Sequence, residues 1–111
     1  MTSQLTTHIL DASTGFPASG VAVVLSKMGD EPGIMQVASG ETDLDGRLSL
    51  GPEFLDHGTH VLTFATGAYF AGLGVETFYP SVTVTFRVTD DTHLHVPLLL
   101  SPYSYSTYRG S

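Results

Sequence analysis

The sequence of 111 residues contains no cysteine. This absence excludes disulfide bonds, thiolate nucleophiles and cysteine metal sites, and the cysteine count alone leaves the redox compartment open. Several catalytic motifs are missing as well, namely the G-x-S-x-G elbow, the H-E-x-x-H zinc helix, the Walker loop and the dinucleotide-binding glycine motif. With no cysteine and no recognisable activated serine, the nucleophile that remains for a hydrolytic reaction is water.

Positive charge is scarce. Lys and Arg together number four against eleven Asp and Glu, which gives a formal net charge of −7. A nucleic acid is not expected as a partner, because contacts to phosphates need clustered cations. Charged residues make up 14% of the chain, against roughly 25% in an average soluble domain. The low fraction indicates that other subunits cover part of the surface, although a small β-rich domain with many Thr and Ser reaches the same balance as a monomer.

Long apolar runs are also missing. No segment approaches the ~18 apolar residues of a membrane span. Residues 1–5 carry neither the basic region nor the apolar region of a signal peptide. We therefore expect a cytoplasmic protein with no membrane partner.

The residues that are present favour one β-rich domain that spans residues 1–111. Apolar and polar residues alternate most clearly over residues 82–89, which predicts a half-buried strand. Similar short β-rich runs are predicted at residues 5–10, 21–27, 35–42 and 60–66, with Gly, Pro or Asp in the loops between them. This spacing is typical of an all-β sandwich. Residues 67–74 are the exception and predict one or two helical turns that Gly74 closes.

A second alternating segment follows a turn signal at residues 90–92. It places His93 and His95 on the same face of a strand, and Pro97 marks an edge strand or a bulge there. Two histidines in this arrangement have the geometry of strand zinc sites, but no third ligand is predictable from the sequence.

Histidine is the candidate activator of water, because imidazole titrates near pH ~6.5. The chain has five histidines. His8 lies in the first predicted strand, where a packing role and a catalytic role both remain open, and the same holds for His95. His57 and His60 flank a loop that enters a strand, and the interpretation we prefer for both is a solvated loop histidine. Arg47 follows a turn at residues 43–46 and is either solvated or an anion clamp.

The end of the chain carries a longer motif. Residues 98–107 read Leu-Leu-Leu-Ser-Pro-Tyr-Ser-Tyr-Ser-Thr and resemble the ending shared by transthyretin and its relatives. Further matching positions lie along nearly the whole chain, at Ile9–Ala12, Gly15, Pro17, Ala38–Gly40, Tyr69 and Leu73–Gly74. The chain is identified on these residues as a member of the transthyretin-like family.

Within this family the chain resembles the branch of 5-hydroxyisourate hydrolases. The residues that carry this resemblance are His8, Arg47, His95 in the run His-Val-Pro, and the final Tyr108, Arg109, Gly110 and Ser111. The thyroid-hormone carrier transthyretin lacks the catalytic histidines at these positions and does not end in these four residues. The resemblance implies hydrolysis of 5-hydroxyisourate in purine catabolism with no cofactor, and a transthyretin-type carrier is the alternative.

The same resemblance implies a sandwich of two four-stranded sheets with one short helix, assembled as a homotetramer with active sites in the cleft between dimers. His8 and His95 would activate water and move its proton, while Arg47 would hold the substrate and stabilise the oxyanion. The four residues from Tyr108 to Ser111 would complete the substrate pocket. Which histidine is the base stays open. A third hypothesis is adventitious zinc binding by the histidines of the cleft, with no metal needed for the reaction.

Overall fold

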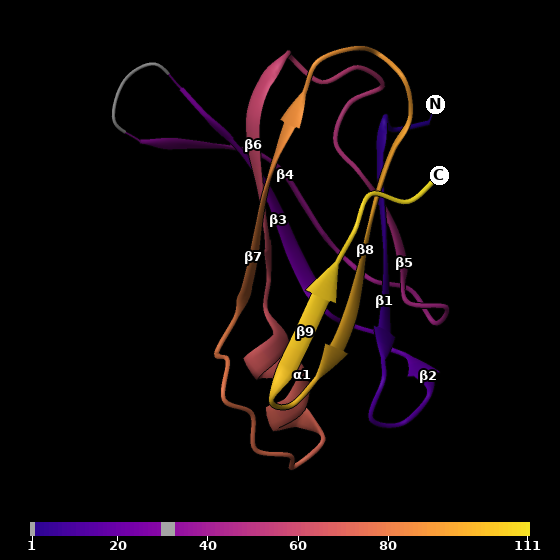
Figure 1. The fold of residues 1–111 in the computed structure, drawn as a ribbon. Coiled ribbons are helices and arrows are strands. Elements are labelled where there is room, and N and C mark those ends of the chain that lie inside the picture. Colours follow the sequence, from indigo (N-terminus) through magenta and orange to yellow (C-terminus); the bar gives the residue numbers. More distant parts are fainter. Residues whose placement is uncertain (1, 30–32) are drawn as a thin grey trace.

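The computed structural model describes residues 2–29 and 33–111, which form two β-sheets packed face to face (Figure 1). In chain order the elements are β1 (Leu5–Asp11), β2 (Phe16–Pro17), β3 (Ala22–Met28), β4 (Ile34–Glu41), β5 (Arg47–Leu50), β6 (Gly58–Phe64), α1 (Thr66–Gly72), β7 (Val82–Val88), β8 (Leu94–Ser101) and β9 (Ser104–Thr107). Within the described ranges, no helix has the length and apolar character that crossing a membrane requires.

The first sheet has the strand order β2-β1-β8-β9, and β5 pairs with β1 as well. Strands β1 and β8 run parallel, whereas the other pairs in this sheet are antiparallel. The second sheet has four antiparallel strands in the order β4-β3-β6-β7. The all-β sandwich is confirmed, and the first sheet has a fifth strand because the two residues of β2 pair with the end of β1.

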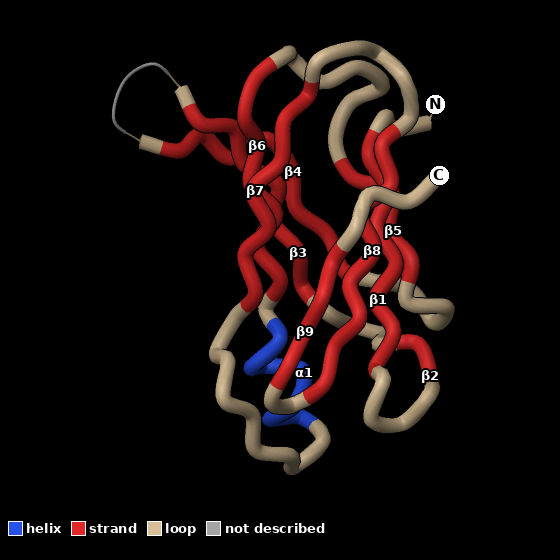
Figure 2. Tube along the Cα trace, viewed as in Figure 1, coloured by secondary structure: helices blue, strands red, loops and turns tan. Residues whose placement is uncertain are grey.

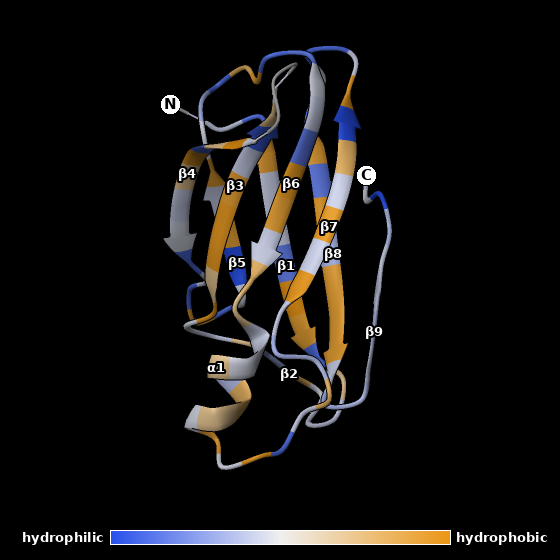
Figure 3. Ribbon diagram, turned by 90° about the vertical axis from the view of Figure 1, so that its left-hand side faces the viewer, coloured by the Kyte–Doolittle hydropathy of each residue, from blue (hydrophilic) through white to orange (hydrophobic). Residues whose placement is uncertain are grey.

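Alternation of side chains explains how the two sheets pack. In β1 every second residue from Leu5 to Asp11 is buried and the residues between them are half-buried. Strand β8 contributes the next inward row, with Leu94, Val96, Leu98 and Leu100 buried. Apolar residues alternate with polar ones along the strands in Figure 3, as expected for sheets with one face toward the core. The other face of the first sheet is therefore free to carry polar side chains.

The predicted helical turns are confirmed as α1. This helix lies at one end of the sandwich, in the connection from β6 to β7 (Figure 2). Gly74 follows it with a φ of 69°, which glycine adopts without strain, and its N–H donates to the carbonyl of Ala71 at 3.1 Å. The helix ends where the sequence predicts.

Pro97 lies neither on an edge strand nor at a register shift of β8, so the prediction of an edge strand or a bulge is wrong. It lies inside β8, between β1 and β9. The β8–β9 ladder ends at the pair Leu98–Thr107, and the Thr107 hydroxyl donates to the Pro97 carbonyl at 2.7 Å. Pairing with β8 resumes in the same register at the bridge between His95 and Gly110, so the ladder is interrupted at Pro97, which has no N–H to donate.

Candidate active site

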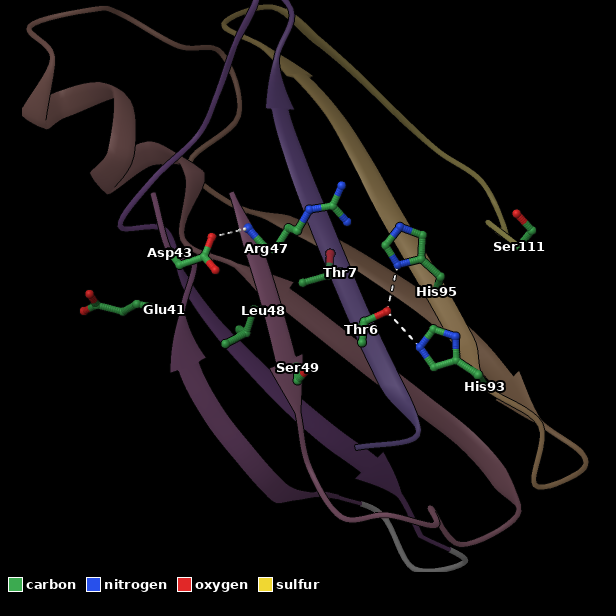
Figure 4. A pocket seen from close by; sticks show the side chains of 10 residues that line it. All are labelled: Thr6, Thr7, Glu41, Asp43, Arg47, Leu48, Ser49, His93, His95 and Ser111. Atoms are coloured by element: carbon green, nitrogen blue, oxygen red, sulfur yellow. Dashed lines mark hydrogen bonds between the residues drawn. The ribbon is translucent and has the colours of Figure 1, made fainter. Parts of the chain in front are cut away.

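A cavity of about 440 Å³ lies on the outer face of the first sheet (Figure 4). The residues that line it come from β1, β4, β5, β8 and the segments next to them, and they are Thr6, Thr7, Glu41, Asp43, Arg47, Leu48, Ser49, His93, His95 and Ser111. Most of these side chains are polar or charged. The lining can therefore bind a polar ligand through several hydrogen bonds.

Strand pairing brings these residues together from distant parts of the chain. Thr6 is paired with Ser49 across β1 and β5, and with His95 across β1 and β8. Residues directly opposite each other in neighbouring strands point to the same face of a sheet. His8, two residues after Thr6, is paired with Arg47 and lies on that same face. The outer face therefore carries a row with Thr6 and His95 and, next to it, a row with His8 and Arg47.

The turn before β5 delivers Arg47 to this face. The Asp43 Oδ1 atom accepts hydrogen bonds from the N–H of Asp45 at 2.9 Å and of Arg47 at 3.0 Å. Gly46 has a φ of 74°, and a Cβ there would lie 2.5 Å from the carbonyl oxygen of Ile9. This confirms the turn predicted at residues 43–46. Figure 4 shows the guanidinium of Arg47 extended across β1 on the side where His95 lies.

His95 and His93 share one hydrogen-bonding partner. The Thr6 Oγ1 atom lies 2.8 Å from Nδ1 of His95 and 3.0 Å from Nε2 of His93. The two imidazole rings are stacked, with centroids 6.4 Å apart and planes 18° apart. The sequence-based prediction that both histidines share one face is confirmed.

The surroundings of His95 favour its neutral form. Burial, followed by the nearby His93 and His8 and by Arg47, lowers the pKa of His95 below its usual 6.5, and a hydrogen bond with the backbone of Thr6 acts in the opposite direction. A neutral imidazole has a free nitrogen that can accept a proton from water. His95 is thus suited to be a general base near neutral pH.

The last residues of the sequence contact both the backbone and the ring of His95. The N–H of Gly110 donates to the carbonyl of His95 at 2.8 Å, and a Cβ at Gly110 would lie only 2.5 Å from Cδ2 of the His95 ring. Ser111 reaches the cavity, but Tyr108 and Arg109 do not. Both of these line a second, more apolar cavity of about 320 Å³, which His95 also borders.

The structure thus places the predicted site residues in three groups. Arg47, His95 and Ser111 line the first cavity. His8 is half-buried beside Arg47 in the sheet but is not among the lining residues. Tyr108 and Arg109 line the second cavity, and Gly110 pairs with His95, which borders both cavities.

The remaining histidines lie elsewhere. His57 is exposed, and its Nε2 lies 3.1 Å from a carboxylate oxygen of Asp91. His60 is buried and stacks on Phe86 at a centroid distance of 5.8 Å, which contradicts the solvated position we preferred for it. In residues 2–29 and 33–111 no three His, Cys, Asp or Glu side chains are grouped closely enough to hold a metal ion.

Thr6, Ser49 and Glu41 also line the first cavity, although the sequence did not predict them as site residues. Nothing in the local sequence distinguishes Thr6 from the other strand threonines. Its position depends on pairing with His95, which is 89 residues away along the chain. Only knowledge of the β1–β8 register could have identified it.

The sequence model described as the HIUase/Transthyretin family matches residues 5–110. A protein of Schizosaccharomyces pombe named a probable 5-hydroxyisourate hydrolase is 44% identical over 112 residues, which cover 96% of this chain and 90% of that protein.

Two solved structures have the same fold. The Klebsiella pneumoniae 5-hydroxyisourate hydrolase is 42% identical with a TM-score of 0.86, covering 96% of this chain and 98% of its own. Sea bream transthyretin, solved in complex with thyroxine, is 32% identical with a TM-score of 0.90, covering 96% of this chain and 94% of its own. The backbone is thus similar to both a hydrolase and a hormone carrier.

Proposed function

Because the chain belongs to the HIUase/Transthyretin family, we propose that it catalyses the hydrolysis of 5-hydroxyisourate to 2-oxo-4-hydroxy-4-carboxy-5-ureidoimidazoline. The observation that carries this proposal is the placement of His95 and Arg47 in the lining of one polar cavity. A base and a cation on the same wall are what the addition of water to an electron-poor ring amide needs.

The reaction adds water across the N1–C6 bond of the substrate. Nε2 of His95 takes a proton from water as the water oxygen bonds to C6, and the negative charge that develops on the carbonyl oxygen is stabilised by Arg47. The C6–N1 bond then breaks, and the proton moves to N1, from His95 or through His8. His95 returns to its neutral form and no cofactor is consumed.

A transthyretin-type carrier is the alternative function. The backbone does not discriminate, since its similarity to sea bream transthyretin is as close as its similarity to the hydrolase. The side chains do, because Glu41, Asp43 and Arg47 place charges of both signs around the cavity. A site for a largely apolar hormone would have to desolvate these charges without pairing them.

We propose that the protein is a homotetramer whose sites lie between two dimers. In support, the cavity is on the outer face of a sheet, where a facing subunit could close it, and the edge strand β9 exposes the aromatic side chain of Tyr105. Light scattering at micromolar concentration should give four times the chain mass. A monomer mass would contradict the proposed tetramer, because no facing subunit would then close the cavity.

The function is tested by following the ultraviolet absorbance of 5-hydroxyisourate made freshly from urate, with and without protein. The wild type should accelerate its decay. In the variant His95→Asn, kcat should fall by roughly 10²-fold or more, because asparagine keeps a hydrogen-bonding side chain but does not carry a proton. His57→Asn is the matched control, because His57 is exposed and borders neither cavity. A wild-type protein that leaves the decay rate unchanged would contradict the proposal.

A further inference from the structure

The side chain of Thr6 contacts both histidines that line the first cavity. Its hydroxyl oxygen lies within hydrogen-bond distance of Nδ1 of His95 and of Nε2 of His93, at 2.8 and 3.0 Å. Thr6 is half-buried in β1 and directly paired with His95 in β8. Its branched side chain also has few rotamers. The hydroxyl is therefore held between the two rings, as the dashed lines in Figure 4 indicate.

A hydroxyl has one proton to donate and two lone pairs to accept, and a neutral imidazole has one N–H and one bare nitrogen. Thr6 can therefore donate to only one of the two rings at a time. If it donates to Nδ1 of His95, the proton of that ring is on Nε2, which then cannot take a proton from water. If it donates to Nε2 of His93 instead, Nδ1–H of His95 donates to Thr6 and Nε2 of His95 is bare. Of these two arrangements, only the second leaves Nε2 of His95 free to act as a base.

The same arrangement fits the charged form of His95. When Nε2 takes the proton from water, the ring becomes an imidazolium with N–H groups on both nitrogens. Nδ1–H then donates to Thr6, while the Thr6 hydroxyl donates to Nε2 of neutral His93. No proton leaves Thr6. Because hydrogen bonds from charged donors are stronger than neutral ones, this contact gains strength as His95 becomes charged.

Charged and titratable groups lie around His95 in both of the cavities that it borders. His93, His8 and Arg47 disfavour its charged form. Glu41 and Asp43 lie across the first cavity, and Arg87 and Arg109 line the second one. Cations therefore lie on both sides of His95, and an acceptor for its Nδ1–H has a large effect on how readily the ring accepts a proton.

We infer that Thr6, with His93 behind it, is a positioning residue that holds His95 in the tautomer with Nε2 bare and stabilises the imidazolium during hydrolysis. The inference rests on the proposed function, since it assigns a partner to the proposed base. Thr6 does not touch the reacting atoms in this scheme and acts through His95.

Two substitutions separate the hydroxyl from the shape of the side chain. Thr6→Val keeps the branched shape and removes the hydroxyl, and Thr6→Ser keeps the hydroxyl. We expect Thr6→Val to lower kcat by roughly 10- to 100-fold, the range of a hydrogen bond to a charged group, with KM nearly unchanged. Thr6→Ser should retain activity within a few-fold. The matched control is Thr85→Val, an exposed strand threonine on β7 that borders neither cavity.

The pH profile gives a readout that a purely structural role would not move. Loss of the Thr6 acceptor makes the His95 imidazolium less stable, so the acidic limb of kcat/KM should move to lower pH in Thr6→Val and stay in place in Thr6→Ser. If Thr6→Val does not fold, His93→Phe tests the same relay at an exposed position, because it keeps a ring but removes the acceptor for Thr6. We expect the same direction of change in kcat.

The ¹⁵N chemical shifts of the His95 ring decide the inference without substrate. In the wild type they should report a protonated Nδ1 and a bare Nε2, and in Thr6→Val the proton should move toward Nε2. If the wild type has no hydrolase activity, the proposed function is wrong. The ¹⁵N measurement still tests whether Thr6 sets the tautomer of His95. Wild-type kcat and pH profile in Thr6→Val, a Thr6→Ser variant as slow as Thr6→Val, or an unchanged tautomer would each overturn the role of Thr6.

Discussion

Gly110→Ala is a minimal change that should disturb catalysis through the contact between the end of the chain and His95. The N–H of Gly110 donates to the His95 carbonyl, so its Cα is held close to the His95 ring. An added Cβ would lie 2.5 Å from Cδ2, 3.2 Å from Cγ and 3.3 Å from Cβ of His95. Gly110 does not have a positive φ, so the effect of alanine comes from this contact and not from backbone strain.

The size of the effect follows from the overlap. Carbon atoms that are not bonded approach to about 3.5 Å, so either the ring or the last residues must move by about 1 Å. If the ring moves, its Nδ1 atom no longer lies within hydrogen-bond distance of the Thr6 hydroxyl. If the end of the chain moves, Ser111 no longer lines the cavity. A misplacement of this size can cost about 10²-fold in rate. We expect kcat/KM to fall by roughly that factor while Tm changes little, because Gly110 contributes a single isolated bridge to the sheet.

The assay is the decay of 5-hydroxyisourate under steady-state conditions, with thermal unfolding measured in parallel. Gly72→Ala is the matched control, because a Cβ there would meet nothing within 4 Å and alanine is favoured over glycine in a helix. It should keep full activity and an equal or higher Tm. Wild-type kcat/KM in Gly110→Ala would mean that the end of the chain does not rest against His95 during catalysis, and our account of the tail would be refuted.

Because burial lowers the pKa of His95 below its usual value in the folded protein, the midpoint of the acidic limb of kcat/KM should lie below pH ~6.5. The stabilisation from neutral His95 is present above pH ~6.5 and is lost as the pH falls through the lowered pKa, so rates and melting curves measured from about pH 5 to 8 check both effects. Gln4→Ala leaves the buried N–H of Leu55 without the acceptor that now lies 2.7 Å away, which should lower stability by about 1–3 kcal/mol in thermal or urea unfolding and leave kcat unchanged. A chain truncated after Thr107 should lose most of its kcat/KM but keep its Tm and its assembly. If the truncated chain is as active as an N-terminally tagged full-length protein, the last four residues do not take part in the active site.

Local patterns predict the parts of the fold that depend on one strand at a time. The alternation at residues 82–89 became β7, and the alternation after residue 92 placed His93 and His95 on one face, because the period of a strand fixes the side on which each residue lies. The helical turns before Gly74 were predictable for a similar reason, since glycine marks the end of a helix.

Pairing between distant strands was not predictable from such patterns. Strand β5 has four residues and only Leu50 among them is buried, so it gives little periodic signal, yet its pairing with β1 sets the position of Arg47. The edge position predicted for Pro97 was wrong because the chain after β9 still runs beside β8, with the ladder interrupted at Pro97 and the bridge of His95 with Gly110 beyond it. A proline in the sequence marks a missing ladder hydrogen bond, but it does not show whether its strand has neighbours on both sides.

The core determines the alignment of the proposed site. A shift of one residue in the β1–β8 pairing would turn one strand's side chains to the opposite face. Leu5 and Ile9 of β1 and Leu94 and Leu98 of β8 are all buried, so such a shift would expose two or more of them to water. Exposing a leucine or isoleucine costs about 1.5–3 kcal/mol each, comparable in sum to much of the stability of a small domain. The inward leucines and isoleucine therefore hold the register, and the register is what places the Thr6 hydroxyl opposite His95 on the outer face.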